Sequence, residues 1–258
     1  MISLLASVRD LTEAQEAAAA GADLIDLKEP SAGALGGLSV EAIGAIVKVL
    51  RSRWPTRPVS ATIGDFAADD HAGRCAQVAA VARCGVSYVK AGLAPGAHAP
   101  AALQALAALR LPSIVIVFLA DRGVDLPLVE QAATMGFAGL MVDTADKAAG
   151  SLLHHADPAA LAALIAVARR HGRLCGLAGS LSREDVGLLR RLAPDFAGFR
   201  GAVCDGDRRG RFNAAKLRDL RSALRARTDQ RTTAEPASGG DSSVRMRASS
   251  VLPSNSIE

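Results

Sequence analysis

Residues 2–29, ISLLASVRDLTEAQEAAAAGADLIDLKE, contain one complete strand–helix–strand unit. The apolar run Ile2–Val8 predicts a buried strand, and the alanine-rich stretch Leu11–Ala20 predicts a helix. Gly21 follows this helix, where a left-handed residue commonly ends one. A second apolar run, Leu24–Glu29, predicts the next strand. Two strands joined through a helix run parallel in one sheet, so this stretch predicts an α/β fold.

The same alternation continues to about Arg227. Further strands are predicted at Pro58–Gly64, Tyr88–Gly92, Ser113–Ala120, Gly139–Thr144, Leu174–Ala178 and Ala197–Val203. Further helices are predicted at Val40–Arg53, Asp69–Cys84, Pro100–Leu109, Pro127–Met135, Pro158–His171, Arg183–Leu192 and Asn213–Arg227. Helix starts are indicated by Thr12, Asp157 and Ser182, and helix ends by Gly21, Gly85, Gly136 and Gly172.

Eight strand–helix units are the number at which a parallel sheet closes into a barrel filled by side chains. We therefore predict a single (β/α)₈ TIM barrel for residues 1–227. The alternative is a doubly wound open sheet, which would need a glycine-rich dinucleotide loop after the first strand, and SVRDLT there has no glycine. Residues 228–258 are rich in Ser, Thr, Gly and Pro without apolar periodicity, so we expect a disordered tail.

Composition favours a protein that binds small molecules. Half of the residues are hydrophobic and only 3% are aromatic, which disfavours the base stacking of a nucleic-acid-binding protein. The net charge of +4 is spread along helices and indicates mild attraction for anionic metabolites. No signal peptide or membrane span is evident, so we expect a cytoplasmic protein without membrane or nucleic-acid partners. The sequence leaves open whether it forms a homo-oligomer.

Metal and disulfide chemistry have little support in the sequence. The four cysteines, Cys75, Cys84, Cys175 and Cys204, show no CxxC spacing, and their apolar neighbours predict reduced core thiols. The five histidines show no spacing typical of metal ligands. We therefore expect neither a metal site nor disulfides.

Three lysines lie at or just after predicted strand ends, where TIM barrels place their catalytic residues. They are Lys28, Lys90 and Lys147, in a chain that has five lysines against twenty-five arginines. A desolvated lysine amine can lose its proton and attack a carbonyl, whereas a guanidinium stays protonated. A second ammonium nearby also favours the neutral amine. The pattern therefore indicates Schiff-base chemistry, although any one of these lysines could be a solvated charge.

Strand periodicity supplies acidic and polar partners for the lysines. Asp26 and Lys28 share one face of their strand, so we expect Asp26 to lie in the barrel and to hold Lys28 in place or relay a proton. Asp143 ends the sixth strand four residues before Lys147, giving a second acid–lysine pair. Polar or aromatic residues expected on the same interior faces are Ser60, Thr62 and Tyr88.

Phosphate binding is expected in the loops after the seventh and eighth strands, where TIM barrels commonly hold phosphate. GLAGSLS contributes Gly179 and Ser180, and FRGAVC contributes Arg200, Gly201 and Ala202. The glycine-rich stretch SAGALGG after Lys28 could bind a second phosphate or form a flexible lid.

Four segments resemble a known family. They are residues 4–37, LLASVRDLTEAQEAAAAGADLIDLKEPSAGALGG, then VSATIGD, YVKAGL and LMVDTADKAAG. They resemble the (5-formylfuran-3-yl)methyl phosphate synthase family of methanofuran biosynthesis, from about Met1 to Arg227. The resemblance implies a lyase that condenses two glyceraldehyde 3-phosphate molecules into 4-(hydroxymethyl)-2-furaldehyde phosphate, for methanofuran or a methanofuran-like C1 carrier.

The resemblance also implies roles for the residues selected above. Lys28 matches the Schiff-base lysine and Lys90 the proton acceptor. Asp26, Asp143 and Lys147 match the other acids and lysine of the active site, and no cofactor is implied. Two alternatives remain, namely another Schiff-base aldolase with a different phosphorylated carbonyl substrate, and a non-catalytic barrel that binds a phosphorylated metabolite.

Overall fold

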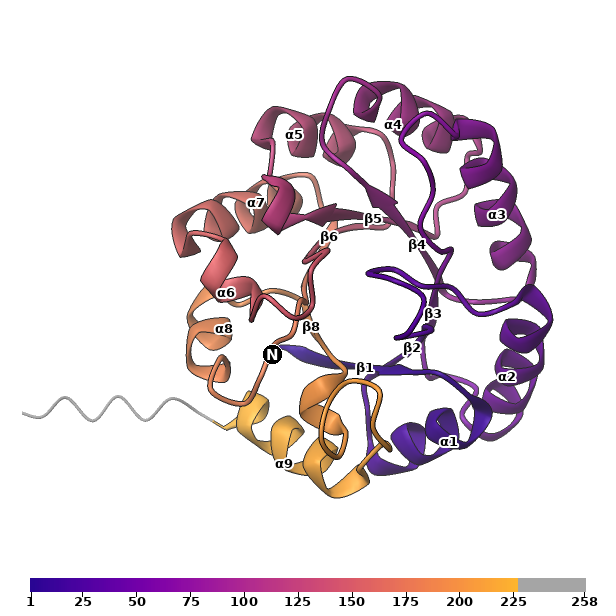
Figure 1. Cartoon of the computed structure of the whole chain (residues 1–258), viewed down its shortest axis with the longest axis vertical. Helices are drawn as coiled ribbons and strands as arrows, with labels where there is room; N and C mark the ends of the chain where they lie inside the picture. The colour runs from indigo at the N-terminus through magenta and orange to yellow at the C-terminus, as the bar shows by residue number, and fades with distance from the viewer. Residues whose placement is uncertain (227–258) are drawn as a thin grey trace, which may run out of the picture. The chain divides into compact units, whose positions relative to one another are not determined.

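The structure is a computed structural model that describes residues 1–226. Eight parallel strands pair in sequence order, and β8 pairs with β1 to close the barrel (Figure 1). The strands are β1 (Ser3–Val8), β2 (Leu24–Leu27), β3 (Val59–Thr62), β4 (Tyr88–Leu93), β5 (Ile114–Leu119), β6 (Gly139–Asp143), β7 (Leu174–Leu177) and β8 (Phe196–Phe199). The predicted (β/α)₈ barrel is confirmed. Arg227 and the predicted tail at 228–258 lie outside the described residues.

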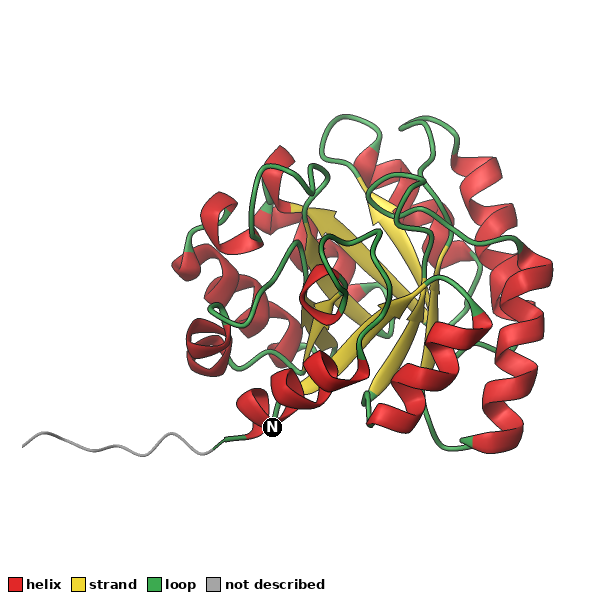
Figure 2. Cartoon of the chain, turned by 60° about the horizontal axis from the view of Figure 1, so that its bottom comes forward, coloured by secondary structure: helices red, strands yellow, loops and turns green. Residues whose placement is uncertain are grey.

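The helices surround the strands on the outside of the barrel (Figure 2). The α-helices are α1 (Leu11–Ala20), α2 (Val40–Arg53), α3 (His71–Arg83), α4 (Ala99–Ala108), α5 (Leu126–Thr134), α6 (Leu152–His155), α7 (Pro158–Arg170), α8 (Val186–Leu192) and α9 (Ala214–Arg225). Two 3₁₀ turns, η1 (Ala120–Arg122) and η2 (Gly201–Val203), follow β5 and β8.

The apolar core has two layers. The larger cluster lies between the sheet and the helices and includes Ile25 and Leu27 of β2. A smaller cluster fills the barrel itself, with members Leu5, Leu35, Val115, Val117, Met141, Ala178 and Phe196. Because side chains fill the lower part of the barrel, polar residues can gather only towards the carboxyl ends of the strands.

Four predicted helix ends are confirmed, and one predicted helix start is wrong. Gly21, Gly85, Gly136 and Gly172 all have positive φ, from 64° to 94°, as predicted. The predicted cap Thr12 is wrong, because Asp10 accepts the N–H of Glu13 at 2.8 Å and begins α1.

The eighth unit and its neighbours also differ from the prediction. Ser182 does not cap α8, which begins at Val186, since its hydroxyl accepts the N–H of Glu184 within a preceding turn. The predicted last strand is too long, because the chain turns into η2 after Phe199. The short helix α6 was not predicted.

The register of the first three strands places polar residues side by side. Ser7 of β1 lies beside Asp26, and Asp26 lies beside Ser60 of β3. Ser60 in turn neighbours Tyr88 on β4, two residues before Lys90. This row of polar residues forms the floor of the site described below.

The four cysteines are free thiols. Cys175 and Cys204 are buried, whereas Cys75 and Cys84 are half-buried against the core rather than within it. Burial raises the pKa of Cys175 to about 12, so that thiol stays protonated. Within residues 1–226, no helix has the length and apolar character needed to cross a membrane.

Candidate active site

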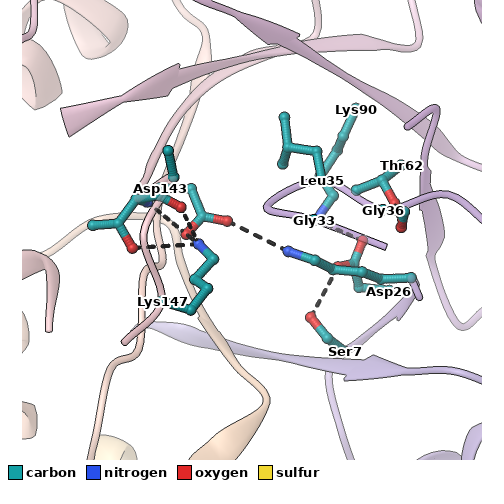
Figure 3. A network of polar contacts seen from close by, with 12 residues as sticks. Ser7, Asp26, Gly33, Leu35, Gly36, Thr62, Lys90, Asp143 and Lys147 are labelled. Carbon is teal, nitrogen blue, oxygen red and sulfur yellow. Dashed lines mark hydrogen bonds and ion pairs between the residues drawn. The ribbon is translucent and has the colours of Figure 1, made fainter. Parts of the chain in front are cut away.

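A cavity of about 340 Å³ opens at the carboxyl ends of the strands. All five predicted catalytic residues line it, namely Asp26, Lys28, Lys90, Asp143 and Lys147. They come from β2 and the residue after it, from β4 and β6, and from the loop after β6, so the closed sheet brings together residues that lie far apart in the sequence. Figure 3 shows Asp143 and Lys147 on one side of the barrel mouth and Asp26 and Lys90 on the other.

The deepest polar contact joins Lys90 to Asp26. The Nζ of Lys90 lies 2.6 Å from Oδ1 of Asp26, and the two residues are 3% and 0% exposed. Ser60 donates its hydroxyl to Oδ1 at 2.6 Å, and Ser7 donates to Oδ2 at 2.9 Å. Asp26 therefore has one cation and two hydroxyl donors, which together compensate a carboxylate that has lost its water.

Lys28 follows directly after β2 and points into the cavity. Its backbone N–H donates to the carbonyl of Val8 at 2.9 Å, which continues the β1–β2 pairing and fixes the side-chain direction. The Nζ lies 3.7 Å from Oδ2 of Asp143, and the residue is 6% exposed. We expected Asp26 to hold Lys28 in place, but the ion pairs differ from this prediction. Asp26 pairs with Lys90, and Lys28 faces Asp143.

The ammonium form of Lys28 is disfavoured. Burial is the main cause that lowers its pKa to about 8, from an ordinary value of 10.5, and the charges of Lys147 and Lys90 act in the same direction. Asp143 and, more weakly, Asp26 oppose this change. A neutral amine is thus accessible near neutral pH, and desolvation contributes more to it than the neighbouring ammonium groups on which the sequence argument rested.

Asp143 is shared between two lysines. Burial acts to raise its pKa, but Lys147 and Lys28 outweigh burial and hold that pKa below its usual value. Lys147 contacts Oδ1 and the carbonyl of Thr144, and the N–H of Thr144 donates to Oδ1 at 2.8 Å. The predicted Asp143–Lys147 pair is therefore present.

Hydrogen bonds to Asp121 fix the backbone of the loop that carries Lys147. The two carboxylate oxygens of Asp121, in η1, accept the N–H groups of Ala145 and Asp146 at 2.7 Å each. Lys147 follows these residues directly, so its backbone is fixed against β5 and its amine reaches Asp143. Asp121 is a positioning residue that the sequence did not identify.

The predicted phosphate loops reach the same cavity. Gly179, Ser180, Gly201 and Ala202 all line it on the side of β7 and β8. Gly179 has φ of +112°, and a Cβ there would approach the backbone nitrogen of Thr144 to 3.1 Å, so this position requires glycine. The hydroxyl of Ser180 donates to the carbonyl of Lys147 at 2.9 Å, which joins this loop to the loop after β6.

Arg200 also lines the cavity, but its guanidinium is engaged within the protein. It forms a two-pronged ion pair with the buried Glu13 of α1 and donates to the carbonyls of Ser7, Arg208 and Gly210. These contacts hold the loop after β8 against β1. The neighbouring arginine, Arg208, was missed in the sequence and faces the cavity.

The loop between β2 and α2 folds back over the barrel. The carbonyl of Gly36 accepts the hydroxyl of Thr62 at 2.8 Å and the N–H of Glu29 at 2.9 Å. Leu35 is 1% exposed, belongs to the cluster inside the barrel and packs on Gly92 of β4. Figure 3 shows Gly33, Leu35 and Gly36 beside Lys90 and Thr62. The stretch SAGALGG thus covers part of the mouth and inserts one apolar side chain.

A comparison with known proteins identifies the family. Residues 4–221 match the model for "4-HFC-P synthase". The chain belongs to this family. The 4-HFC-P synthase match covers the whole described barrel except for a few residues at each end.

Individual 4-HFC-P synthase relatives are similar over most of their length. A Methylorubrum extorquens protein, whose name assigns it provisionally as (5-formylfuran-3-yl)methyl phosphate synthase, is 40% identical over 224 residues, which is 86% of this chain and 92% of the relative. The (5-formylfuran-3-yl)methyl phosphate synthase of Methanosarcina acetivorans is 34% identical over 221 residues, covering 81% and 93% of the two chains.

Among solved structures, phosphoribosyl anthranilate isomerase from Thermotoga maritima superposes with a TM-score of 0.60 at 14% identity, covering 87% of this chain and 98% of that one. At this identity the likeness supports the barrel fold alone. Within residues 1–226, no three His, Cys, Asp or Glu side chains are placed to share a metal ion.

Proposed function

We propose that this chain is a (5-formylfuran-3-yl)methyl phosphate synthase that joins two molecules of glyceraldehyde 3-phosphate through a Schiff base on Lys28. The observation that carries the proposal is the buried Lys28 amine, with a pKa of about 8, in a cavity beside Asp143 and Lys147. Membership of the 4-HFC-P synthase family supports the choice of product. By the same family relationship, the product would serve methanofuran or a similar C1 carrier.

The first steps follow from the position of Lys28. Its neutral amine attacks the carbonyl carbon of one triose phosphate, and loss of water from the adduct gives an iminium ion. Asp143, whose Oδ2 lies 3.7 Å from the amine, is placed to accept and return the protons of this step. Lys147, on the other oxygen of Asp143, keeps that carboxylate ionised at neutral pH.

Carbon–carbon bond formation requires removal of a proton from the carbon next to the iminium. Lys90 is the proposed acceptor, and Asp26, whose Oδ1 lies 2.6 Å from its Nζ, is the group with which it exchanges a proton during this step. The resulting enamine attacks the aldehyde of the second triose phosphate. Ring closure and dehydration then release one phosphate and two waters. One further water, equal to the one lost when the iminium formed, hydrolyses the bond between Lys28 and the substrate and frees the amine. Overall, two trioses give one furan phosphate, one phosphate and two waters.

The test is to trap the adduct and analyse the product. Incubation with glyceraldehyde 3-phosphate and borohydride should add the mass of one reduced triose phosphate at Lys28, located by peptide mass spectrometry. Without borohydride, an ultraviolet-absorbing furan phosphate should accumulate. Lys28→Arg keeps the charge but removes the nucleophile, so it should abolish both signals while the protein stays folded.

Lys48→Arg is the matched control, because Lys48 is an exposed lysine on α2 and should retain both signals. A trapped adduct without a furan product would favour another Schiff-base aldolase. Neither adduct nor product, with binding of the triose phosphate retained, would favour a non-catalytic barrel and reject the proposal.

A further inference from the structure

Arg208 reaches over the catalytic cavity from the loop after β8. Its side chain lines the cavity, is half-buried, and places Nη2 3.5 Å from the carbonyl of Gly33 in the β2–α2 loop. Partial burial lowers the pKa of Arg208, and the negative charge of Asp143 acts to raise it. The guanidinium thus spans two loops of the barrel mouth and lies within electrostatic range of Asp143, the acid that faces Lys28.

The loop around Arg208 is held so that this side chain turns inwards. Arg200 donates from Nε to the carbonyl of Arg208 at 2.7 Å and from Nη2 to the carbonyl of Gly210 at 3.2 Å. Glu13 fixes Arg200 in turn, so the backbone of the loop is tied to α1 and β1. The next residue, Arg209, turns outwards, where its exposed side chain pairs with Asp207 at 2.9 Å.

The charges around the cavity leave Arg208 without a counter-ion. Asp26 is paired with Lys90, and Asp143 is shared by Lys28 and Lys147. Arg200 is paired with Glu13. Among residues 1–226, no carboxylate lies within ion-pair distance of the Arg208 guanidinium, and its only hydrogen bond to these residues is the long contact to the carbonyl of Gly33. A half-buried cation in this state favours an anionic ligand.

We infer that Arg208 binds the phosphate group of the substrate held at Lys28 and closes the cavity between the loops after β8 and β2. The inference rests on the proposed function for the identity of the substrate. A guanidinium presents paired N–H donors that match two oxygens of a phosphate. The phosphate replaces the weak contact to Gly33 with charge-assisted hydrogen bonds, and the N–H groups around Gly179 and Gly201 supply further donors on the same side of the cavity.

The first test uses inorganic phosphate and needs no catalysis. Titration calorimetry should show that Arg208→Gln weakens phosphate binding roughly 10- to 100-fold, the range expected for loss of a charged hydrogen-bonding group. Arg209→Gln is the matched control, and should bind as the wild type does. Arg208→Lys keeps the charge without the paired donors and should lie between the two. Equal binding by wild type and Arg208→Gln, each with a native circular dichroism spectrum, would overturn the inference.

The second test separates phosphate binding from a general structural role. Borohydride trapping at Lys28 should slow roughly 10- to 100-fold in Arg208→Gln with glyceraldehyde 3-phosphate, but change little with unphosphorylated glyceraldehyde. An equal loss with both aldehydes would reject a role in phosphate binding. Because calorimetry is independent of the adduct, failure of trapping in the wild type would reject the proposed function and leave the Arg208 result standing.

Discussion

Lys28 and Lys90 are two buried lysines in one cavity, yet their surroundings differ. Lys90 lies 2.6 Å from a carboxylate that no other lysine shares, and that carboxylate is held by two serine hydroxyls. Lys28 lies 3.7 Å from Asp143, whose other oxygen contacts Lys147. Both lysines are buried, but only Lys90 has a close and undivided counter-ion.

The difference supports the proposal that Lys28, and not Lys90, is the nucleophile. With a pKa of about 8, about one tenth of Lys28 side chains are uncharged at pH 7, against fewer than about one in a thousand for an ordinary lysine. Lys28 thus gains reactivity because its partner is more distant and shared. Lys90, held tightly by Asp26, is suited to move a proton within a fixed pair.

The largest effect on stability is expected from breaking the ion pair between Lys90 and Asp26. Asp26→Asn leaves the Lys90 ammonium buried beside a neutral amide, so we expect a loss of about 3–5 kcal/mol in the free energy of unfolding at pH 7. Urea denaturation measures this change. Ser60→Ala removes one hydroxyl donor from the same carboxylate and should cost only about 1 kcal/mol. A similar small loss for Asp26→Asn would show that Lys90 is not charged in the folded protein.

A somewhat smaller effect is expected from the pH dependence of stability. Lys28 has a folded pKa of about 8 and an ordinary value of 10.5, so the unfolded chain binds more protons between these values. Above pH 10.5 Lys28 is neutral in both the folded and the unfolded protein and costs no stability. As the pH falls from 10.5 through 8, protonation favours the unfolded chain and the free energy of unfolding decreases. The difference amounts to about 3 kcal/mol.

Comparison with Lys28→Met isolates this contribution from that of other groups. The variant should be more stable than the wild type at pH 7, by up to about 3 kcal/mol, and the advantage should shrink as the pH rises towards 10.5. Denaturation curves at several pH values provide the measurement. If the difference in the free energy of unfolding between the two proteins does not change with pH, the pKa of Lys28 is not lowered in the folded protein.

The fold could be predicted from the sequence because each strand–helix unit carries its own local signals. Gly21 and Gly172 end helices through their backbone conformation, and short β-branched apolar runs such as Ile114–Leu119 are typical of strands buried on both faces of a sheet. Element ends were less predictable where several residues could cap a helix, as with Asp10 and Thr12. The predicted end of the last strand was wrong because the 3₁₀ turn η2 that follows β8 has no periodic sequence pattern.

The members of the site could be predicted, but not their pairing. Alternation along β2 indicates that Asp26 and Lys28 face inwards, and it contains no information on residues across the barrel. The stagger of the strands brings Lys90 to Asp26, and closure of the barrel brings Asp143 of β6 to Lys28. Arg208 was missed because its direction depends on Arg200, which is itself held by Glu13, a residue distant in sequence.

The smallest effects should come from the two neighbours that share the site with Lys28, and they should have opposite signs. Asp143 raises the pKa of Lys28, so Asp143→Asn should lower it below about 8; Lys147 lowers that pKa, so Lys147→Gln should raise it. Acetylation of Lys28 by acetic anhydride, followed by mass spectrometry from about pH 6 to pH 10, reports the neutral amine without requiring catalysis. At pH 7 the rate should rise several-fold in the first variant and fall several-fold in the second. Shifts in the same direction would mean that burial alone sets the reactivity of Lys28, and that the shared carboxylate does not tune it.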